Sequence, residues 1–465
     1  MVIVSAKAFA PIEQSCYWMA SRPPRAATRL AGDVAADVAI VGAGFTGLWT
    51  ALFLKELEPS LSVCVLEKSA AGYGASGRNA GIVGETIDHS HELAIAHFGL
   101  DEARELARVG RENLDEMERF LRERAIDAGF ERPGQLNVAL TPAHVEGLEA
   151  SRAAAERVGA AGWKVLSRAE TQAEVASPLY LGALVAPRNA LVDPVRLVDG
   201  LRAEAARRGV RVYEGAEVRG FEFPADRVVV ETPEGSVRAR RAVLATNAYS
   251  HHLFPRLAFR FLPLYDYILV SEPLTPAQRA AIGWKRRQAV VDARTFFNYY
   301  RLTADDRILW GTSEAAYYPG NRVDAACDHS PKHYADLRAS FRRHFPPLAD
   351  LEFPYSWGGP IASTTRLTPF FGTLAGRLSY GLGYTGHGIG STRVAGKILA
   401  HLALDRKSPL LELSMVRRKP FPFPPEPLRR LAVAAVTRSL RKVDAGGRPG
   451  WMLKALDAMG IGFSS

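Results

Sequence analysis

Cysteine is scarce in this sequence, which holds three among its 465 residues, Cys16, Cys64 and Cys327. An odd number without CxxC spacing excludes a disulfide framework and gives no zinc signature, so we expect no metal site. Long apolar runs are also lacking, because none reaches the roughly 18 residues that cross a bilayer. The start, Met1 to Ser5, has neither a basic segment nor a small-residue cleavage site, and we therefore expect a cytoplasmic protein.

Acidic residues are also few relative to basic ones. The sequence has 59 Lys and Arg and 49 Asp and Glu, which gives a formal net charge of +10. Residues 415–465 carry ten of these basic residues and three acidic ones, so most of the imbalance lies in the tail. Nucleic-acid binding would require basic residues gathered on one face with stacking aromatics. The tail instead combines its arginines with an apolar stripe, and we expect no nucleic-acid partner.

The composition that is present is that of a globular protein. Hydrophobic residues make up 47%, charged residues 23% and aromatics 9%, which excludes disorder for most of the chain. At roughly 150 residues per domain the length allows about three units, and a large two-domain enzyme fits equally well.

The strongest motif lies near the start of the chain. A short apolar run, residues 38–41, ends in the glycine turn Gly42-Ala43-Gly44-Phe45-Thr46-Gly47, and a helical pattern follows. A second apolar run, residues 61–66, closes on Glu67. Strand, glycine turn, helix, strand and acid within about 30 residues are typical of a dinucleotide-binding βαβ unit.

The residues of this motif suit a bound diphosphate. Gly42 permits the tight bend, Gly44 lets the backbone approach a pyrophosphate, and Gly47 allows close helix packing. The helix N-terminus offers unpaired N–H groups. Glu67 can accept both hydroxyl hydrogens of an adenosine ribose, and it would repel a 2′-phosphate.

A second glycine-rich segment, residues 72–81, follows Glu67 and holds too many glycines for regular structure. One interpretation is a surface loop. The other is a second backbone cradle, in which Ser76 and Arg78 donate hydrogen bonds to phosphate or ring oxygens. The residues alone do not decide between the two.

Further elements follow from periodicity and turn signals. Aromatic and branched residues are concentrated in residues 259–318, which we interpret as most of an antiparallel sheet. The other expected elements are an arm over residues 1–36, a helix over about 92–124, a strand over 135–140, a helix from Asp193-Pro194 and a last helix over about 392–404, after the glycine-rich segment 381–390.

Together these residues resemble a known family. The sequence is similar to the FAD-dependent amine and D-amino-acid oxidase superfamily, which includes glycine oxidase and monomeric sarcosine oxidase, and is most similar to its gamma-glutamylputrescine-oxidase-like branch. The resemblance spans nearly the whole chain. The segments that carry it are Tyr17-Trp18, the glycine turn, Ala75-Ser76-Gly77-Arg78-Asn79, Asp193-Pro194, Ala245-Thr246-Asn247-Ala248, Asn298-Tyr299-Tyr300-Arg301, Gly383-Tyr384-Thr385-Gly386-His387-Gly388 and the tail Gly460-Ile461-Gly462-Phe463.

The resemblance implies an α+β fold with an α/β flavin domain. A discontinuous Rossmann-like FAD-binding domain (37–95, 186–258 and 356–405) joins a substrate domain with a large, mainly antiparallel sheet (96–185 and 259–355), and a basic C-terminal extension covers 406–465. FAD is expected to be non-covalent, because residues 355–361 lack the cysteine that some relatives use; His89 and His91 are the remaining candidates for attachment. The implied FAD-binding residues are Gly42, Gly44, Phe45, Thr46, Gly47, Glu67, Lys68, Gly74, Ala75, Ser76, Arg78, Asn79, Val218, Ala245, Thr246, Gly386, Gly388 and Ile389.

The substrate-site candidates come from the same resemblance. His387 stands among glycines and is expected beside the flavin, although it could simply fix its turn. Tyr299 and Tyr300 alternate on a strand, so at most one faces the substrate. Tyr265 and Tyr267 share a face in a segment that lines the site in relatives. The predicted catalytic residues are His387, Tyr267, Tyr300 and Arg301, the last as a clamp for an anionic group.

The implied reaction is oxidation of a primary or secondary amine to an imine by hydride transfer to flavin N5, followed by hydrolysis of the imine. Oxygen, a quinone or another carrier would reoxidise the flavin. The alternatives are a hydroxy-acid or glycerol-phosphate dehydrogenase, a flavin-dependent RNA-modification protein and a non-catalytic flavoprotein subunit. The carboxylate-binding arginine and lysine of relatives are missing at 357–361 and 387–390, so compact α-amino acids are not the expected substrates.

The tail has two interpretations. Residues 428–443 form a helical pattern with Leu431, Val433, Ala434, Val436 and Leu440 on one side and arginines on the other. Such a helix either packs on the body with its basic face in water or lies as a peripheral helix on the inner face of a membrane.

Overall fold

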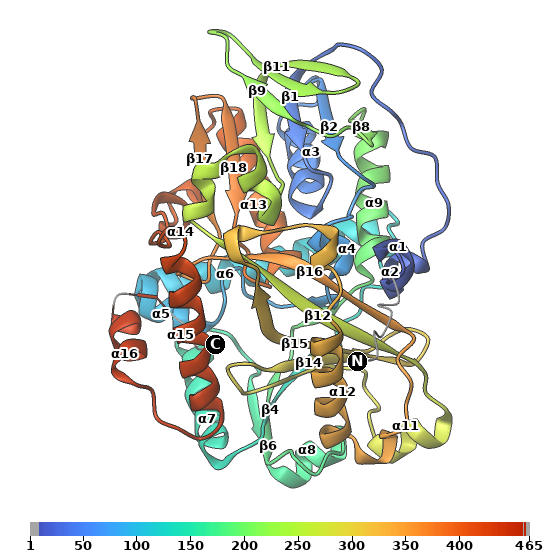
Figure 1. The fold of residues 1–465 in the computed structure, drawn as a ribbon, viewed down its shortest axis with the longest axis vertical. Helices are drawn as coiled ribbons and strands as arrows, with labels where there is room; N and C mark the ends of the chain where they lie inside the picture. Colours follow the sequence, from blue (N-terminus) through green and yellow to red (C-terminus); the bar gives the residue numbers. More distant parts are fainter. Residues whose placement is uncertain (1–8, 459, 462–465) are drawn as a thin grey trace, which may run out of the picture.

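The computed structural model describes residues 9–458, 460 and 461 and contains two eight-stranded sheets and a small two-stranded sheet. One large sheet lies at the top of Figure 1 and the other in its lower half. One is mainly parallel and the other mainly antiparallel, which confirms the predicted fold class. The first eight residues of the predicted arm and Gly462-Phe463 of the tail motif lie outside the described residues.

The first sheet is built around the predicted nucleotide-binding unit. Its strands lie in the order β17-β18-β11-β1-β2-β8; the pairs from β18 to β8 are parallel, and β10 and β9 extend from β11 as an antiparallel ribbon. The strands are β1 (Val34–Val41), β2 (Val63–Glu67), β8 (Arg211–Glu214), β9 (Gly220–Glu222), β10 (Val228–Thr232), β11 (Gly235–Leu244), β17 (Phe370–Leu374) and β18 (Leu378–Leu382).

Both faces of this sheet are covered, which explains the continuous apolar run of β1. Val38 and Ile40 belong to the core cluster formed with the helices, whereas Ala39 and Val41 belong to a separate cluster on the opposite face. The helices that contribute to the first cluster are α3 (Phe45–Leu57), α6 (Leu100–Glu123), α9 (Pro194–Arg207) and α13 (Gly388–Ala403).

The second sheet has the order β16-β12-β15-β14-β13-β4-β6-β5, and the pair of β13 with β4 is its one parallel pair among the described strands. Helix α12 (Pro331–His344) contacts β12 and β15, and Tyr334, Leu337 and Phe341 join its core. The strands are β4 (Gln135–Ala139), β5 (Lys164–Leu166), β6 (Gly182–Ala186), β12 (Leu262–Pro273), β13 (Ala289–Asp292), β14 (Asn298–Leu302), β15 (Arg307–Tyr317) and β16 (Tyr355–Ser363).

The remaining elements are short or peripheral. Strands β3 (Ile82–Val83) and β7 (Ala190–Leu191) form the two-stranded sheet. The other helices are α1 (Ile12–Ser15), α2 (Tyr17–Ala20), α4 (Ala75–Arg78), α5 (His91–Phe98), α7 (Pro142–Arg157), α8 (Arg168–Glu174), α10 (Ser250–Leu253), α11 (Pro276–Ile282), α14 (Ser414–Arg417), α15 (Leu428–Asp444) and α16 (Trp451–Ala458), with 3-10 turns at Asn247–Tyr249, Pro255–Phe259, Pro319–Asn321, Ala325–Cys327, Pro346–Leu348 and Pro409–Glu412.

Several expected elements differ in detail from the observed ones. The helix expected over 92–124 is two helices, α5 and α6, because Gly99 between them has φ +80°. The segment over 72–81 is not wholly irregular, since α4 forms one helical turn within it. The helix start at Asp193 is as expected: its carboxylate accepts hydrogen bonds from the N–H groups of Val195 and Arg196, at 2.9 and 3.0 Å.

One predicted domain boundary falls inside a strand. The resemblance predicts that residues 356–405 belong to the FAD-binding domain, but β16 pairs with β12 along its whole length, with Tyr267 opposite Gly358. Residues 355–363 are therefore the edge strand of the second sheet. The chain crosses to the first sheet only after Ser363.

The C-terminal extension packs on the body of the protein. Helix α15 runs down one side of the second sheet, at the left in Figure 1, with α16 beside it. Asp444, at its end, accepts hydrogen bonds from the N–H groups of Thr295 and Phe296, both at 2.8 Å, and Arg441 donates to Glu314 at 2.8 Å. Within the described part of the chain, no helix has both the length and the apolar character to cross a membrane.

Candidate active site between the two sheets

A cavity of about 1320 Å³ is lined by residues from both large sheets. On one side lie the carboxyl ends of β1 and β2, the edge at which open α/β sheets bind ligands. On the other side lie residues of β4, β12, β13, β14 and β16. The cavity therefore spans the predicted cofactor region and the predicted substrate region.

The glycine turn has the geometry that a diphosphate site needs. Gly42 has φ +104°, and a Cβ atom there would lie 2.8 Å from the carbonyl oxygen of Ala245. A Cβ at Gly47 would lie 1.9 Å from the carbonyl oxygen of Gly42, so this glycine allows α3 to pack against the turn. Gly47 itself is absent from the cavity lining, whereas Gly44, Phe45 and Thr46 belong to it.

Glu67 ends β2 inside the cavity. Its carboxylate accepts hydrogen bonds from the N–H groups of Ala43, at 2.9 Å, and Ser69, at 3.0 Å. Burial raises the pKa of this carboxyl group above its ordinary value. Each carboxylate oxygen can accept a further hydrogen bond, so the group can still take the hydroxyl hydrogens of a ribose.

The second glycine-rich segment forms a wall of the cavity and not a free surface loop. The Ser76 hydroxyl accepts a hydrogen bond from the N–H of Phe45 at 2.9 Å, which joins the two glycine turns. Asn79 holds its own turn: its amide donates to the carbonyl oxygens of Ala75 and Ser76, and its oxygen accepts from Gly81. Gly74, Ala75, Ser76 and Asn79 all line the cavity.

Arg78 binds the second sheet as well as the cavity wall. Its Nη1 lies 2.7 Å from the Asp328 carboxylate and donates to the carbonyl oxygen of Gly358 at 3.2 Å, and its Nε donates to Tyr73 at 2.7 Å. The side chain is 3% exposed, and its Nη2 is buried without a hydrogen-bond partner. A buried N–H donor of this kind needs an acceptor, which a flavin or phosphate oxygen would supply.

The last glycine-rich loop runs from β18 into α13. His387 precedes the helix, and its Nδ1 lies 3.3 Å from the carbonyl oxygen of Thr385. Its ring centroid lies 4.5 Å from that of His89, and burial lowers the pKa of both imidazoles. His387 lines the cavity, as do Gly386, Gly388 and Ile389.

The other predicted cofactor residues also reach the cavity. Val218, Ala245 and Thr246 line it, and the Thr246 hydroxyl is hydrogen-bonded to Ser250 at 2.8 Å. Lys68 lines it too and forms an exposed ion pair with Glu217 at 2.6 Å. The glycine cradle, the N-terminus of α3, the Glu67 carboxylate and the orphaned Arg78 nitrogen together fit an adenine dinucleotide such as FAD.

Two of the predicted catalytic tyrosines lie outside the cavity. Tyr300 is buried in the core of the second sheet, where its ring stacks on Trp310 at 4.2 Å and its hydroxyl is hydrogen-bonded to Tyr180. Tyr267 is buried on the same side, with its hydroxyl 2.9 Å from the carbonyl oxygen of Cys327. Strand alternation explains both corrections, because the neighbouring residues, Tyr299 and Asp266, face the cavity instead.

Arg301 is likewise absent from the cavity lining. Its Nη1 donates to the carbonyl oxygens of Val192, at 2.8 Å, and Gly81, at 3.0 Å, and its Nε donates to Leu302. Burial lowers its pKa to about 10. The guanidinium donates its hydrogen bonds to backbone carbonyl oxygens. The prediction that Arg301 binds an anionic group is therefore corrected, and the side chain instead holds neighbouring segments of the fold together.

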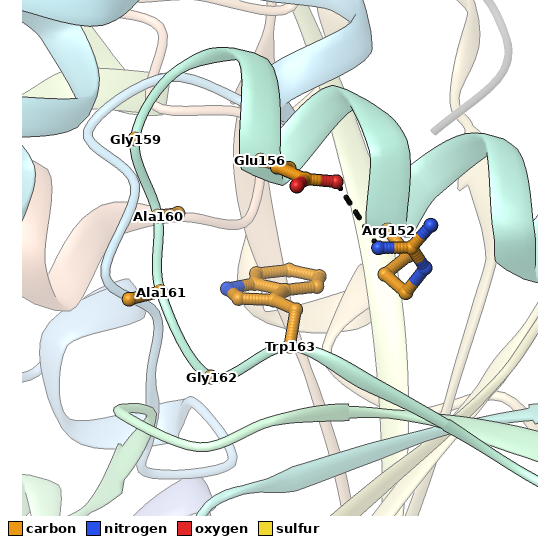
Figure 2. A pocket seen from close by; sticks show the side chains of 7 residues that line it. All are labelled: Arg152, Glu156, Gly159, Ala160, Ala161, Gly162 and Trp163. Atoms are coloured by element: carbon orange, nitrogen blue, oxygen red, sulfur yellow. Dashed lines mark hydrogen bonds and ion pairs between the residues drawn. The ribbon is translucent and has the colours of Figure 1, made fainter.

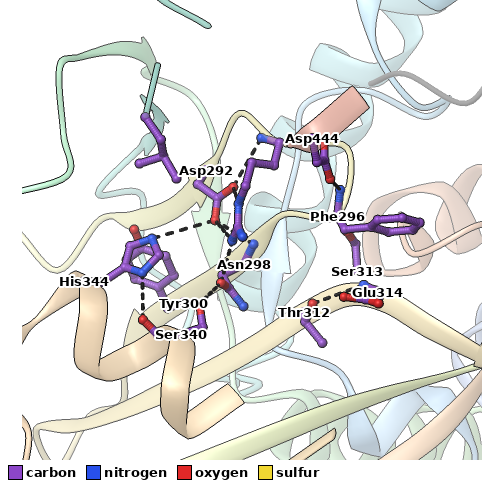
Figure 3. Close-up of polar contacts among 12 residues, drawn as sticks. Asp292, Phe296, Asn298, Tyr300, Thr312, Ser313, Glu314, Ser340, His344 and Asp444 are labelled. Atoms are coloured by element: carbon purple, nitrogen blue, oxygen red, sulfur yellow. Dashed lines mark hydrogen bonds and ion pairs between the residues drawn. The ribbon is translucent and has the colours of Figure 1, made fainter. Parts of the chain in front are cut away.

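A buried polar network supports the loop that closes one end of the cavity (Figure 3). Asp292 of β13 lines the cavity and is paired with Arg294 at 2.7 Å, while Arg294 also donates to Asn298. His344 of α12 lies 3.9 Å from the Asp292 carboxylate on the far side. Beyond this loop, Leu440 of α15 also lines the cavity, so the C-terminal helix forms part of its wall.

A smaller surface hollow of about 350 Å³ lies beside α7 (Figure 2). Arg152 and Glu156 lie on its helical side, 3.2 Å apart. Trp163 lines both this hollow and the large cavity, and its indole N–H donates to Glu85 at 2.8 Å. The indole therefore stands between the hollow and the cavity.

The charge of the cavity lining is mainly acidic. Among its described residues, Lys68 and Arg78 are the sole lysine and arginine, and each is paired with a carboxylate. The carboxylates are Glu67, Glu85, Glu92, Glu217, Asp266, Asp292, Asp324 and Asp328. Glu85, Glu217, Asp292, Asp324 and Asp328 form ion pairs with lysine or arginine side chains, whereas Asp266 has no such partner among the described residues. The excess of basic residues that the composition predicts lies mainly in residues 415–465.

Sequence reasoning missed Asp266 and Tyr299 as a pair. Their side chains meet inside the cavity wall, where the Tyr299 hydroxyl donates to Asp266 Oδ2 at 2.6 Å. The available signal was an aspartate in the middle of the apolar run of residues 261–270. A buried strand position rarely holds a carboxylate unless the group is used.

Comparison with known proteins agrees with this geometry. The family described as FAD dependent oxidoreductase (DAO) matches residues 37–402. Gamma-glutamylputrescine oxidoreductase from Escherichia coli (strain K12) is 32% identical over 372 residues, covering 80% of this chain and 84% of that protein.

Two solved structures have the same fold. Glycine oxidase from Geobacillus kaustophilus superposes with a TM-score of 0.69 at 21% identity, covering 83% of this chain and 99% of that one. L-proline dehydrogenase from P. horikoshii superposes with a TM-score of 0.68 at 18% identity, covering 83% and 96%. With the family match spanning most of the sequence and the glycine cradle at its expected place, the chain belongs to the DAO family of FAD-dependent oxidoreductases.

Proposed function

We propose that this enzyme oxidises a primary or secondary amine to an imine, which water then hydrolyses to a carbonyl compound and a smaller amine or ammonia. FAD accepts a hydride at N5 in such a reaction. The chain supplies the rest: it holds the cofactor through the glycine turns and Glu67, desolvates the amine, and positions it in the cavity.

The acidic cavity lining is the observation that carries this proposal. An anionic substrate would need a free arginine or lysine, because a carboxylate or phosphate buried without a cationic partner costs several kcal/mol. Arg78 and Lys68 are both paired and lie among the predicted FAD-binding residues. Asp266, by contrast, stands on the substrate side with no cationic partner among the described residues.

The same argument disfavours the alternative substrates. Hydroxy acids and glycerol phosphate carry an anionic group close to the reacting carbon, as compact α-amino acids do. We infer an amine whose acidic group is absent or lies several bonds away, as in acylated polyamines. The name of the E. coli relative, gamma-glutamylputrescine oxidoreductase, supports this substrate class.

The test is anaerobic mixing of the purified yellow protein with a panel of amines. Loss of the visible band of oxidised flavin with longer amines, at rates well above those with glycine, sarcosine or D-alanine, is the expected result. Faster reduction by one of those three small amino acids would overturn the substrate class, and reduction by glycerol phosphate alone would overturn amine oxidation. Acid precipitation of the same sample shows whether the flavin is covalent, with colour in the supernatant expected.

We also propose a peripheral membrane contact through the C-terminal extension. The outer side of α15 exposes Leu428 by 59% and Leu431 by 63%, and Trp451 at the start of α16 is 84% exposed. Arginines flank these residues, which is the pattern of a helix that binds an anionic lipid surface. Helix α15 can therefore pack on the body of the protein with one side and contact lipid with the other.

A further inference from the structure

Asp266 projects from β12 into the substrate side of the cavity. Leu264, Asp266 and Ile268 line the cavity, whereas Tyr265 and Tyr267 between them are packed in the core on the opposite face. The carboxylate thus interrupts an otherwise apolar stripe of wall.

Tyr299 orients this carboxylate from two strands away. Tyr299 lies on β14 opposite Gly311 of β15, and β15 lies next to β12. A Cβ atom at Gly311 would come within 2.2 Å of the Tyr299 ring, so the phenol crosses β15 over this glycine to reach Asp266. The glycine and the tyrosine together fix Asp266 Oδ2.

The other carboxylate oxygen has no partner. Asp266 Oδ1 is buried and accepts no hydrogen bond, and no lysine, arginine or histidine among the described residues forms an ion pair with this group. On the neighbouring strand β16, Gly359 lies opposite Asp266 and against the Arg78 side chain, whose Nη1 is paired with Asp328 at 2.7 Å. Burial raises the pKa of Asp266 to about 7, partly offset by the Tyr299 hydrogen bond.

We propose that Asp266 binds the ammonium group of the substrate through Oδ1 and removes its proton before oxidation, with Tyr299 as the positioning residue. The inference rests on the proposed amine oxidation. In the step, the N–H bond of the ammonium breaks and an O–H bond forms on Asp266, which gives a neutral amine and a neutral carboxylic acid. The nitrogen lone pair freed in this way is required for loss of the adjacent hydride.

This assignment narrows the substrate class. The ammonium ion must carry at least one N–H to give a proton to Asp266, so protonated primary, secondary and tertiary amines meet this requirement and quaternary ammonium ions do not. The wall beside Asp266, formed by Leu264, Ile268 and Ile361, favours an apolar chain next to the nitrogen.

The test uses tert-butylammonium chloride, a primary ammonium without hydrogen on the carbon beside nitrogen, so it binds without being oxidised. Titration calorimetry on the FAD-loaded protein measures its affinity. Affinity should rise about tenfold between about pH 6 and about pH 8, because a carboxyl group with a pKa near 7 changes from mostly protonated to mostly ionised over this range. Binding of tert-butanol, the neutral analogue, should not depend on pH.

Two variants decide the assignment. Asp266→Asn should weaken tert-butylammonium binding at about pH 8 at least about tenfold and remove the pH dependence. Tyr299→Phe removes the hydrogen bond that favours the ionised carboxylate, so the midpoint of the pH dependence should move to higher pH. Asp336→Asn, the same change at an exposed carboxylate on α12, is the matched control and should bind as the wild type does.

Contrary outcomes are distinct from failure of the proposed function. Wild-type affinity for the ammonium in the Asp266→Asn variant, or a pH midpoint unmoved by Tyr299→Phe in a folded protein, would overturn the role of Asp266. If the ammonium binds in the predicted pH-dependent way but no amine reduces the flavin, the assignment of Asp266 as the ammonium-binding residue is supported and the proposed amine oxidation is overturned. Flavin content and melting temperature of each variant identify any that fail to fold.

Discussion

The substrate side of this enzyme is decided by which of two adjacent residues faces the cavity. Sequence patterns identified the right strands, β12 and β14, but selected Tyr267 and Tyr300 where Asp266 and Tyr299 are the residues in the wall. Both faces of these strands carry large side chains, so the two-residue period does not show which face packs on α12. The positions of the glycine motifs are easier to predict, because the spacing of the glycines in the sequence indicates a tight turn in which a side chain would clash.

At Glu67 we predict a loss of cofactor affinity on truncation. The carboxylate holds the N–H groups of Ala43 and Ser69 and is the proposed ribose ligand, so Glu67→Ala should weaken FAD binding at least about tenfold. The ratio of flavin to protein absorbance after dialysis measures this. Glu67→Gln keeps an acceptor oxygen and should retain more FAD than the alanine variant. Equal retention by the wild type and Glu67→Ala would contradict the assignment.

At Gly311 we predict that one methyl group disturbs the site. A Cβ atom there would overlap the Tyr299 ring, so Gly311→Ala should displace the phenol and weaken tert-butylammonium binding several-fold. The cost in unfolding free energy should be about 1–3 kcal/mol, measured by denaturant titration. Gly450→Ala, where a Cβ meets no atom within 4 Å, is the control. Unchanged affinity in a stable Gly311→Ala protein would show that Tyr299 does not depend on this gap.

At the scale of elements, the sequence predicts those helices and strands whose formation depends on neighbouring residues. The βαβ unit, the Asp193 cap and the antiparallel sheet over 259–318 follow from turn residues and periodicity. The pairing of β16 with β12 could not be predicted in the same way, because it joins segments about 90 residues apart and depends on the register of an edge strand on its neighbour. The same holds for Asp444, whose partners lie 149 and 148 residues away.

The contact of α15 with the cavity loop gives a prediction for this element. Asp444→Ala removes the acceptor of two backbone N–H groups, so the loop over residues 293–297 should loosen and the unfolding free energy should fall by about 1–3 kcal/mol. Limited proteolysis should cut this loop faster, with flavin content unchanged. Asp457→Ala, on exposed α16, is the control. Equal proteolysis rates for the two variants would mean that α15 does not hold the loop.

At the scale of the whole molecule, basic charge and acidic cavity are separated. Residues 415–465 carry ten basic and three acidic residues, while the cavity lining holds eight carboxylates against one lysine and one arginine. The family and its dependence on FAD could be predicted, because the glycine turns and their spacing are local features of the sequence. The character of the cavity could not, because it depends on which charged residues of distant segments are already paired.

The tail leads to a prediction for the intact protein. Replacing Leu428 and Leu431 with glutamate should abolish cosedimentation with anionic vesicles and leave flavin content intact, because both side chains are largely exposed. Wild-type binding should fall as salt is raised, since the arginines contribute through screened charge. Removal of residues 427–465 should have the same effect on sedimentation. If the wild-type protein does not cosediment with anionic vesicles, the proposed membrane contact is wrong and the extension only packs on the body.

Two of the buried arginines, Arg78 and Arg301, join the parts of the chain on either side of the cavity. Arg301 of β14 holds the carbonyl oxygens of Gly81 and Val192, and Arg78 holds Gly358 and Asp328. Separation of the two sheets would break the hydrogen bonds and the ion pair of these two guanidinium groups, at a cost of several kcal/mol each. We therefore expect substrate exchange to leave the two sheets in place, so a cross-link between them should leave turnover intact.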